Sequence, residues 1–491
     1  MIEEMQTRLA RLQAMRDAGI DPFPSTTQRT HTVAEFLRTF ETQMSSQTDA
    51  TLVGRIRLIR THGGLTFCHL QDGSGLMQIV FRKDHIGEIE YKQFLQMIDI
   101  GDFVQCTGKA FVTKKGEQSL DIFSYRSLAK ALLPLPEKWH GLSDVETRFR
   151  KRYLDLIMNS DVRDRLLTRS KIIAAIRNLL DERGFIEVET PTLQPVYGGG
   201  FARPFKTHHN ALDADFYLRI SDEMYLKRLI VGGFEKVYEI TKVFRNEGID
   251  RDHNPEFTMF EAQIAYQNYF YGMDLFEEIF EHSVKQSVGK TQVRHGEILV
   301  ELARPWKRIR LIEAVEKIGE ISKEIWNDEE LARLELKKRL SKDQHENIAR
   351  MKSVGELMAF AFEELVEEKL VQPTIVYDYP VEVSPLAKKS VDPRFVERFE
   401  AFALGSEIGN NYSELNDPVD LEKRFIAEKA REEAGFEEAH QTDFDYLEAI
   451  QHGMPPTFGL GIGIDRMVML LTGAENIKEV ILFPTLRPEV K

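Results

Sequence analysis

Five short β-prone runs follow one another between residues 51 and 128, separated by glycines and turn residues. They are TLVGRIRLI (51–59), LTFCHLQD (65–72), LMQIVF (76–81), DFVQCTGKAFVT (102–113) and SLDIFSYRSL (119–128). Several such strands within about 100 residues are typical of a small barrel or sandwich. Before them, residues 1–45 have a helical pattern that is interrupted at GIDPFPSTT.

From about residue 146 the pattern changes to long helices mixed with strands. Apolar side chains recur at helical spacing over residues 162–183, and Gly184 follows as a C-terminal cap. These side chains are Val162, Leu166, Ile172, Ile173, Ile176, Leu179 and Leu180. The next run, FIEVETP, alternates like a strand and is expected to stop before Pro191.

These patterns predict an α+β protein with a β module ahead of a larger domain. Residues 1–45 form a helical segment and residues 46–130 the β module. A linker is expected at 131–145, where the stretch KALLPLPEKWHGLSD contains two prolines. The large α+β domain is expected over 146–491, with a charged helical excursion from its core at about 300–370.

The sequence FRNEGIDRDHNPEFTMFE, residues 244–261, places many polar side chains between two apolar runs. If the two runs form paired strands, alternate side chains from both share one face of the hairpin. That face carries Val237, Glu239, Thr241, Val243, Arg245 and Glu247 from the first run and Phe257, Met259, Glu261 and Gln263 from the second. A guanidinium suits a phosphate or a carboxylate, and an aromatic ring suits a nucleobase. The alternative is a solvent-exposed hairpin with surface ion pairs.

A glycine-rich stretch, GLGIGIDR at residues 459–466, is a second candidate for nucleotide binding. Glycines allow the backbone to pack closely against a nucleotide, and Arg466 would begin a helix beside the phosphates. A glycine-mediated contact between a helix and a strand is the alternative interpretation.

Three glutamates recur at seven-residue intervals in RFEAFALGSEIGNNYSELND, namely Glu400, Glu407 and Glu414. On a helix this spacing would form a coiled-coil seam, but the glycines and β-prone residues between them argue against a helix. Separate carboxylates that enter one pocket would bind Mg²⁺ or a cationic group of a substrate. Exposed surface positions are the alternative.

Composition places few further limits on the 491-residue chain, which is 42% hydrophobic and 29% charged. The net charge of −14 argues against an extensive basic surface, although local patches can still bind nucleic acid. The sequence contains no apolar run of membrane-spanning length and no secretion signal. Cys68 and Cys106 belong to no CxxC pair, so we expect reduced thiols in a cytoplasmic protein rather than metal ligands.

Together these segments resemble the three signature motifs of class II aminoacyl-tRNA synthetases. The helix–strand–proline unit that ends at Pro191 is similar to motif 1, FRNEG…HNPEFT to motif 2, and GLGIGIDR to motif 3. Within class IIb, the segments ARPFKTHHNALD, YLRISDEMYLKRLIVGGFEKVYEI and YPVEVSPLAKK most resemble lysyl-tRNA synthetases. The likeness covers nearly the whole chain and is weakest at 300–370.

The resemblance implies a class II catalytic domain, an antiparallel sheet flanked by helices, preceded by an OB-fold barrel that binds the anticodon. It also implies a homodimer formed through the motif 1 helix and strand. The implied reaction joins lysine to ATP as lysyl-adenylate and then transfers the lysyl group to the 3′ end of tRNA(Lys). Because the lysine carboxylate is itself the nucleophile, catalysis would come from alignment and from cations near the phosphates.

By the same resemblance, ATP binds bent on the hairpin. Arg245 would hold the α-phosphate, Phe257 would stack under the adenine and Arg466 would hold the γ-phosphate, so Arg245 and Arg466 are the catalytic candidates. The other ATP-binding candidates are Glu247, His253, Asn254 and Glu407. Glu400 and Glu407 match the positions that hold Mg²⁺ in the family.

The family pattern also assigns a lysine site. Its members here are Gly199, Glu223, Glu261, Gln263, Asn410, Tyr412 and Glu414. Glu223 and Glu261 would face the α-amino group, Arg245 with Asn410 the carboxylate, and Tyr412 the aliphatic stem. Glu414 would meet the ε-ammonium, because a desolvated charge requires an opposite partner. An aspartate side chain there would face a carboxylate, which disfavours the aspartyl and asparaginyl relatives.

Three positions depart from the family pattern. Gln263 stands where a tyrosine is usual, so we expect weaker or less selective binding of lysine. Asp252 stands where a basic residue usually precedes the histidine; Arg251 is a candidate to compensate, and a loop that holds ATP differently is the alternative. Phe458 replaces a smaller residue before the motif 3 glycines and is expected to alter packing.

In the barrel, Phe67 and Gln78 match the anticodon readers of the family, with Arg55 and Glu117 as further contributors. Aromatic stacking together with hydrogen bonds to splayed bases is how OB-folds read single strands. A buried position in the barrel core is the alternative for Phe67.

Three other functions compete with a lysine–tRNA ligase. A lysyltransferase that modifies a protein would share the catalytic motifs, but such relatives typically lack the barrel. A regulatory RNA-binding paralogue would be expected to lack the phosphate-binding arginines, and Arg245 and Arg466 are both present. A class IIb-like synthetase for another amino acid is the third, because of Gln263.

Overall fold

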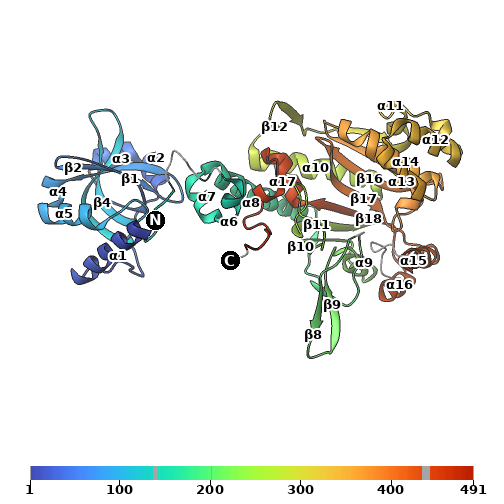
Figure 1. The fold of residues 1–491 in the computed structure, drawn as a ribbon, viewed down its shortest axis with the longest axis horizontal. Coiled ribbons are helices and arrows are strands. Elements are labelled where there is room, and N and C mark those ends of the chain that lie inside the picture. Colours follow the sequence, from blue (N-terminus) through green and yellow to red (C-terminus); the bar gives the residue numbers. More distant parts are fainter. Residues whose placement is uncertain (1, 137–141, 143, 201, 434–442, 490–491) are drawn as a thin grey trace. The chain divides into compact units, whose positions relative to one another are not determined.

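The computed structural model describes residues 2–136, 142, 144–200, 202–433 and 443–489 (Figure 1). It contains two compact units, Met1–Ser143 and Asp144–Lys491, and each is considered by itself. Residues 137–141 and 143 of the predicted linker lie outside the described residues.

The first unit is built on a closed barrel with the strand order β1-β2-β3-β5-β4. Its strands are β1 Ala50–His62, β2 Leu65–Gln71, β3 Leu76–Arg82, β4 Phe103–Val112 and β5 Gln118–Ala129. Alternate side chains point inward, so that Leu52, Cys68 and Ile79 are fully buried in one core. β1 and β4 stand at the two ends of this strand order and pair with each other, which closes the sheet. The strands therefore form a barrel and not a sandwich.

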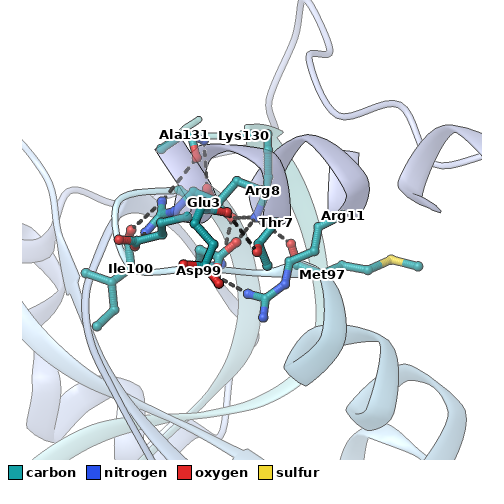
Figure 2. Close-up of polar contacts among 11 residues, drawn as sticks. Glu3, Thr7, Arg8, Arg11, Met97, Asp99, Ile100, Lys130 and Ala131 are labelled. Carbon is teal, nitrogen blue, oxygen red and sulfur yellow. Dashed lines mark hydrogen bonds and ion pairs between the residues drawn. The ribbon is translucent and has the colours of Figure 1, made fainter. Parts of the chain in front are cut away.

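Helices cover this barrel, and the first of them is fixed to it by buried charges. The helices are α1 Ile2–Asp17, α2 Val33–Arg38, α3 Phe40–Ser46, α4 Lys83–Ile86 and α5 Glu88–Met97. Arg8 of α1 donates to the backbone oxygens of Ile100 and Ala131 at 3.0 and 3.1 Å (Figure 2). Lys130 forms ion pairs with Asp99 at 2.5 Å and with Asp102 at 2.7 Å. Ile100 lies just before β4, and Ala131 lies just after β5. Arg8 therefore holds α1 at the start of β4 and the end of β5.

The second unit contains an eight-stranded sheet with the order β14-β15-β16-β17-β18-β11-β10-β6. These strands are β6 Ile186–Glu187, β10 Lys236–Phe244, β11 Glu256–Ala265, β14 Lys307–Arg310, β15 Thr374–Pro380, β16 Phe395–Ala403, β17 Ser406–Ser413 and β18 Thr457–Gly463. The two outermost pairs are parallel and the central pairs are antiparallel. Two small sheets consist of β7 Leu193–Gln194, β8 Lys206–His209 and β9 Ala214–Leu218, and of β12 Gln292–His295 and β13 Ile298–Glu301.

Helices lie on both sides of this sheet (Figure 1). The α-helices described in this unit are α6 Val145–Arg150, α7 Arg152–Met158, α8 Ser160–Glu182, α9 Glu223–Val231, α10 Tyr269–Val288, α11 Leu311–Lys317, α12 Glu329–Arg339, α13 His345–Arg350, α14 Val354–Leu365, α15 Pro418–Glu433, α16 Phe444–Gln451 and α17 Ile464–Thr472. The barrel and the helix-flanked, mostly antiparallel sheet confirm the predicted fold class.

The helix predicted over 162–183 is α8, and Gly184 follows it with a positive φ of 74°. The strand predicted in FIEVETP is much shorter than its alternating pattern suggested. Only Ile186 and Glu187 pair with β10, at the edge of the sheet, before the chain turns away toward Pro191.

In the segment predicted as a helical excursion, helices begin at Leu311 and end at Lys369; they are α11 to α14 and three short 3₁₀ helices. Just before it, β14 joins the main sheet as an edge strand beside β15. The helices share a core with that edge, in which Leu311, Phe362 and Phe402 are buried together. The segment is therefore an extension of the sheet's own core.

Candidate active site

A cavity of about 420 Å³ opens on one face of the eight-stranded sheet. Every residue predicted to bind ATP or lysine lines it. They are Gly199, Glu223, Arg245, Glu247, His253, Asn254, Phe257, Glu261, Gln263, Glu407, Asn410, Tyr412, Glu414 and Arg466. Of the predicted catalytic-domain residues, only Glu400 does not line this cavity.

The hairpin of β10 and β11 supplies the centre of the cavity. Its register places Val243 opposite Phe257 and Glu239 opposite Glu261, so the predicted shared face is present. Arg245 extends the pairing beyond β10, since its N–H donates to the carbonyl of Pro255 at 2.9 Å. Its guanidinium carbon lies 5.2 Å from the centre of the Phe257 ring, a cation–π distance. Burial lowers the pKa of Arg245, an effect opposed by the Glu247 and Glu261 carboxylates.

Arg466 reaches the same cavity from the start of α17, which directly follows β18. This strand pairs with β11 on the side opposite to β10. The glycine-rich stretch forms β18 and then the first turn of α17, as predicted. One Arg466 nitrogen donates to the carbonyl of Glu407 at 3.1 Å, and another donates to Nε2 of His253 at 3.1 Å. Nδ1 of His253 lies 2.9 Å from Asp250, so a ring that accepts at Nε2 donates there from Nδ1. The two arginines therefore face one space.

Asp465, the neighbour of Arg466, is a buried junction between three elements. Its carboxylate accepts from Arg169 of α8 at 2.5 Å and from the backbone N–H of Thr258 in β11 at 2.6 Å. Arg169 also donates to the Thr258 hydroxyl at 2.8 Å. The positions of α8, β11 and the start of α17 are thus fixed by one carboxylate.

Asp252, which departs from the family pattern, and Arg251, the candidate to compensate for it, lie in different places. Asp252 lines the cavity. Arg251 instead donates to the backbone oxygen of Glu475 at 2.6 Å and does not line it.

Two carboxylates near Arg466 are the candidates for a divalent cation. Glu407 lines the cavity and lies 3.9 Å from Arg466. Glu400 accepts from the Tyr379 hydroxyl at 2.7 Å and forms a short ion pair with Arg398. Burial and the charge of Glu400 raise the pKa of Glu407. Among the described residues, no group of three or more acidic, histidine or cysteine side chains is arranged to hold a metal ion.

The other end of the cavity is lined by acids. Ser221 donates to both oxygens of Glu261, at 2.9 and 3.1 Å, and the Tyr412 hydroxyl donates to Glu223 at 2.6 Å. Gly199 has a φ of 83°, and a Cβ there would fall 2.7 Å from Oγ of Ser221. A side chain at position 199 would therefore disturb the hydroxyl that orients Glu261.

Asp222 adds a further carboxyl behind these acids. It is fully buried, and neither of its side-chain oxygens has a hydrogen-bond partner among the residues that the structure describes. Burial and the nearby Glu239 raise the pKa of Asp222 to about 8. Burial, Asp222 and Glu223 also raise the pKa of Glu261. A cationic group between these acids would relieve their mutual repulsion.

Glu414 and Gln263 form the floor of this end. The Gln263 amide nitrogen donates to Oε1 of Glu414 at 2.9 Å, and the amide oxygen is buried without a partner in the described part of the chain. Oε2 of Glu414 lies 2.5 Å from the ammonium of Lys227. Gly459 makes room for both side chains, because a Cβ there would fall 2.1 Å from Glu414 Oε1 and 2.8 Å from the Gln263 amide nitrogen. The floor thus presents acceptor oxygens to a donor in the cavity.

Sequence reasoning missed Lys227 and Arg398. Lys227 follows Glu223 at the i, i+4 spacing of a helical ion pair, which was a usable signal. Arg398 lines the cavity, donates to the Asn410 side-chain oxygen at 3.0 Å and stands two residues before Glu400. The alternation along β16 places Arg398 and Glu400 on one face, a second usable signal.

The predicted anticodon residues lie in the barrel unit. Phe67 in β2 is half-buried, and Gln78 in β3 is buried and donates to Ser119 at 2.8 Å. Arg55 in β1 lies 4.2 Å from the centre of the Phe103 ring and donates to the backbone of Gly101. Glu117 is exposed in the turn before β5.

Comparison with known protein families agrees with this geometry. Residues 144–487 match the model of the tRNA synthetases class II (D, K and N) family. Residues 50–128 match the model of the OB-fold nucleic acid binding domain family. The second unit, with its sheet, hairpin and cavity, thus has the fold and site of a class II tRNA synthetase, and the chain belongs to this class.

Relatives that match over nearly the whole chain show to which group within this class the chain belongs. The chain is 46% identical over 491 residues to "Lysine--tRNA ligase" of Bacillus subtilis (strain 168), covering 99% of this chain and 97% of that protein. It is 48% identical over 487 residues to "Lysine--tRNA ligase" of Carboxydothermus hydrogenoformans, covering 99% and 98%. The protein of the same name from Roseiflexus sp. (strain RS-1) is 48% identical over 488 residues, covering 99% of each chain. Within the class, the chain belongs to the lysine–tRNA ligases.

Proposed function

We propose that the protein is a lysine–tRNA ligase that activates lysine with ATP and transfers the lysyl group to tRNA(Lys). The observation that carries the proposal is the single cavity with two ends. Arg245 and Arg466 lie where a triphosphate would bind, and Glu223, Glu261 and Glu414 line the other end. A ligand with a carboxylate near the phosphates and two ammonium groups among the acids fits this distribution of charge.

In the first step a lysine carboxylate oxygen attacks the α-phosphorus of ATP. The new O–P bond gives lysyl-adenylate, and the bond to the leaving oxygen breaks to release pyrophosphate. Arg245 is the residue proposed to stabilise the negative charge that develops on the α-phosphate, and Arg466 the charge on the leaving group. In the second step a ribose hydroxyl at the 3′ end of tRNA attacks the lysyl carbonyl carbon and AMP leaves.

Selection of lysine is assigned to the floor of the cavity. The ε-ammonium has three N–H donors, and the unpartnered amide oxygen of Gln263 and the carboxylate of Glu414 can accept two of them. A side chain that ends in a methyl group would leave these buried acceptors without donors. The α-amino group is assigned to Glu223 and Glu261.

Mg²⁺ is proposed as the metal ion that binds with ATP. Glu407 and Glu400 provide the carboxylate oxygens that Mg²⁺ prefers, and the repulsion between them is what a divalent cation would relieve. Phosphate oxygens and water would complete the coordination. Bound there, Mg²⁺ would neutralise charge on the phosphates of ATP.

The finer assignments for the partners are also proposals. The barrel is proposed to read the anticodon of tRNA(Lys) with Arg55, Phe67, Gln78 and Glu117, supported by the family model that matches the barrel. A homodimer through α8 and β6 is proposed because Leu167 and Ile186 are 49% and 50% exposed there.

A cytoplasmic location is proposed on the basis of Cys68 and Cys106, which are free thiols buried in the barrel. Among the described residues, no helix combines the length and apolarity that a membrane crossing requires.

ATP–pyrophosphate exchange with each of the standard amino acids tests the proposal. We expect exchange to depend on lysine, followed by lysine charging of purified tRNA(Lys). Exchange that depends on a different amino acid, or none with lysine, would contradict the assignment.

A further inference from the structure

Lys227 carries a buried ammonium group that the reaction outlined above does not use. It lies in α9, and its side chain has an exposed fraction of 0%. Removing an ammonium ion from water is unfavourable unless carboxylates or other acceptors replace the lost water. The groups that surround Lys227 therefore indicate its role.

The ammonium connects two carboxylates of the amino-acid end. It forms a short ion pair with Glu223 and a second ion pair, at 2.5 Å, with Oε2 of Glu414. Both carboxylates line the cavity, whereas Lys227 lies behind them. The ring centres of Tyr412 and Tyr446 lie 5.3 and 5.8 Å from the Lys227 nitrogen, and these rings shield it from solvent. Lys227 thus contacts the site only through its neighbours.

The charge of the carboxylates that line this end is balanced when Lys227 is counted together with the substrate. Three carboxylates, Glu223, Glu261 and Glu414, line the amino-acid end. Lysine brings two ammonium groups to them, while its own carboxylate is opposite Arg245. The Lys227 ammonium compensates the third carboxylate.

We propose that Lys227 is a positioning residue for lysine selectivity, which joins Glu223 to Glu414 and keeps the Glu414 carboxylate directed at the ε-ammonium of the substrate. This inference rests on the proposed lysine–tRNA ligase function. Without the Lys227 ammonium, Glu223 and Glu414 would repel each other, and Glu414 would hold its proton more tightly. A neutral Glu414 would no longer prefer an ammonium over a methyl group.

The test compares lysine with norleucine, whose side chain ends in a methyl group. In ATP–pyrophosphate exchange, KM for lysine and Ki for norleucine as a competitive inhibitor give a selectivity ratio. We expect Lys227→Met to reduce the preference for lysine about tenfold or more, the effect of losing a charge-assisted hydrogen bond. KM for ATP should change less than about threefold, because Lys227 does not line the cavity. A general structural defect would weaken lysine, norleucine and ATP together.

Arg228→Met is the matched control on the same helix. Arg228 forms its ion pair with Asp443, at 2.5 Å, and does not line the cavity. Its removal should leave the selectivity ratio unchanged. An unchanged ratio in folded Lys227→Met, or an equal fall in both variants, would overturn the proposal.

Glu414→Gln, alone and combined with Lys227→Met, provides a second test that does not require the single Lys227 variant to fold. If Lys227 acts through Glu414, adding Lys227→Met to Glu414→Gln should change the ratio by less than about threefold. A further fall of about tenfold in the double variant would overturn the proposal. Failure of the wild-type protein to exchange with lysine would overturn the proposed function itself. Normal exchange by the wild-type protein, with a selectivity ratio that Lys227→Met does not change, would reject only the role of Lys227.

Discussion

The ring of Phe458 in β18 lies directly over Gly272 in α10, so closely that a Cβ at Gly272 would fall 2.0 Å from its Cζ. Phe458 is fully buried and stacks on Phe399, with the ring centres 6.0 Å apart. The large residue that departs from the family pattern therefore lies in the core of the sheet and not in the cavity. Gly272 has no side chain and so leaves the space that the Phe458 ring occupies.

Gly272→Ala is expected to lower the free energy of unfolding by about 1–3 kcal/mol, as overpacking of a core does. Thermal or denaturant unfolding measures the change. Combining Gly272→Ala with Phe458→Ala should recover part of the loss relative to the sum of the two single variants, because the alanine at 458 removes the clash. Additive effects of the two substitutions would contradict this packing.

Arg245→Ala is expected to abolish formation of lysyl-adenylate while the fold is retained. The guanidinium lies on the cavity beside Phe257, where the α-phosphate is proposed to bind. Pyrophosphate exchange measures the loss, and circular dichroism checks the fold. Arg394→Ala is the control, because Arg394 is an exposed residue paired with Asp392. Near-normal exchange in Arg245→Ala would refute the assignment.

Gln263→Tyr is expected to lower KM for lysine. The Gln263 amide oxygen is buried without a partner and is carried on a flexible side chain, whereas a tyrosine hydroxyl is held on a rigid ring. Steady-state exchange with varied lysine measures the effect, and KM for ATP is the internal reference. An unchanged or higher KM for lysine would show that the glutamine is already the better partner.

The binding of lysine is expected to weaken as the pH falls from 8 to 6. Burial raises the pKa of Glu414 to about 8, although the charge of Lys227 opposes the shift. Below that pH the empty site holds a proton on Glu414, which must leave before the carboxylate can accept from the ε-ammonium. KM for lysine should therefore rise as the pH falls through about 8, by up to about tenfold per pH unit.

Stability of the lysine-free protein should show the opposite trend. A carboxyl group whose pKa is raised by folding binds protons more tightly when folded, so its contribution to stability decreases as the pH rises toward about 8. Glu414→Gln removes the titrating group and should flatten both pH profiles. Profiles that keep their slopes in this variant would assign the effect to Glu261 or Asp222.

Much of the fold and site could be predicted from the sequence because the signals are local. Alternation fixed the shared face of β10 and β11, since pairing strands keep a period of two. The glycines between Glu400 and Glu414 correctly excluded a helix, and the structure contains β16 and β17 there. The residues predicted for ATP and lysine meet at one cavity, although their roles remain predictions.

The failures have a common physical cause, which is that contacts with distant parts of the chain decide the structure at these positions. Lys227 looks like an ordinary exposed lysine of an amphipathic helix until Glu414 and Tyr446 enclose it. The alternation in FIEVETP predicted a strand that stops before Pro191, but only Ile186 and Glu187 find a partner at the sheet edge. The edge strand β14 was missed for the same reason, because its pairing with β15 joins segments far apart in sequence.

Asp465 has a mechanical consequence for a dimer. Its carboxylate connects α8, the helix proposed for the subunit contact, to β11 and to the turn that carries Arg466. If α8 forms the proposed subunit contact, a shift of α8 would be transmitted through this carboxylate to the start of α17 and to Arg466, the residue proposed to bind the triphosphate.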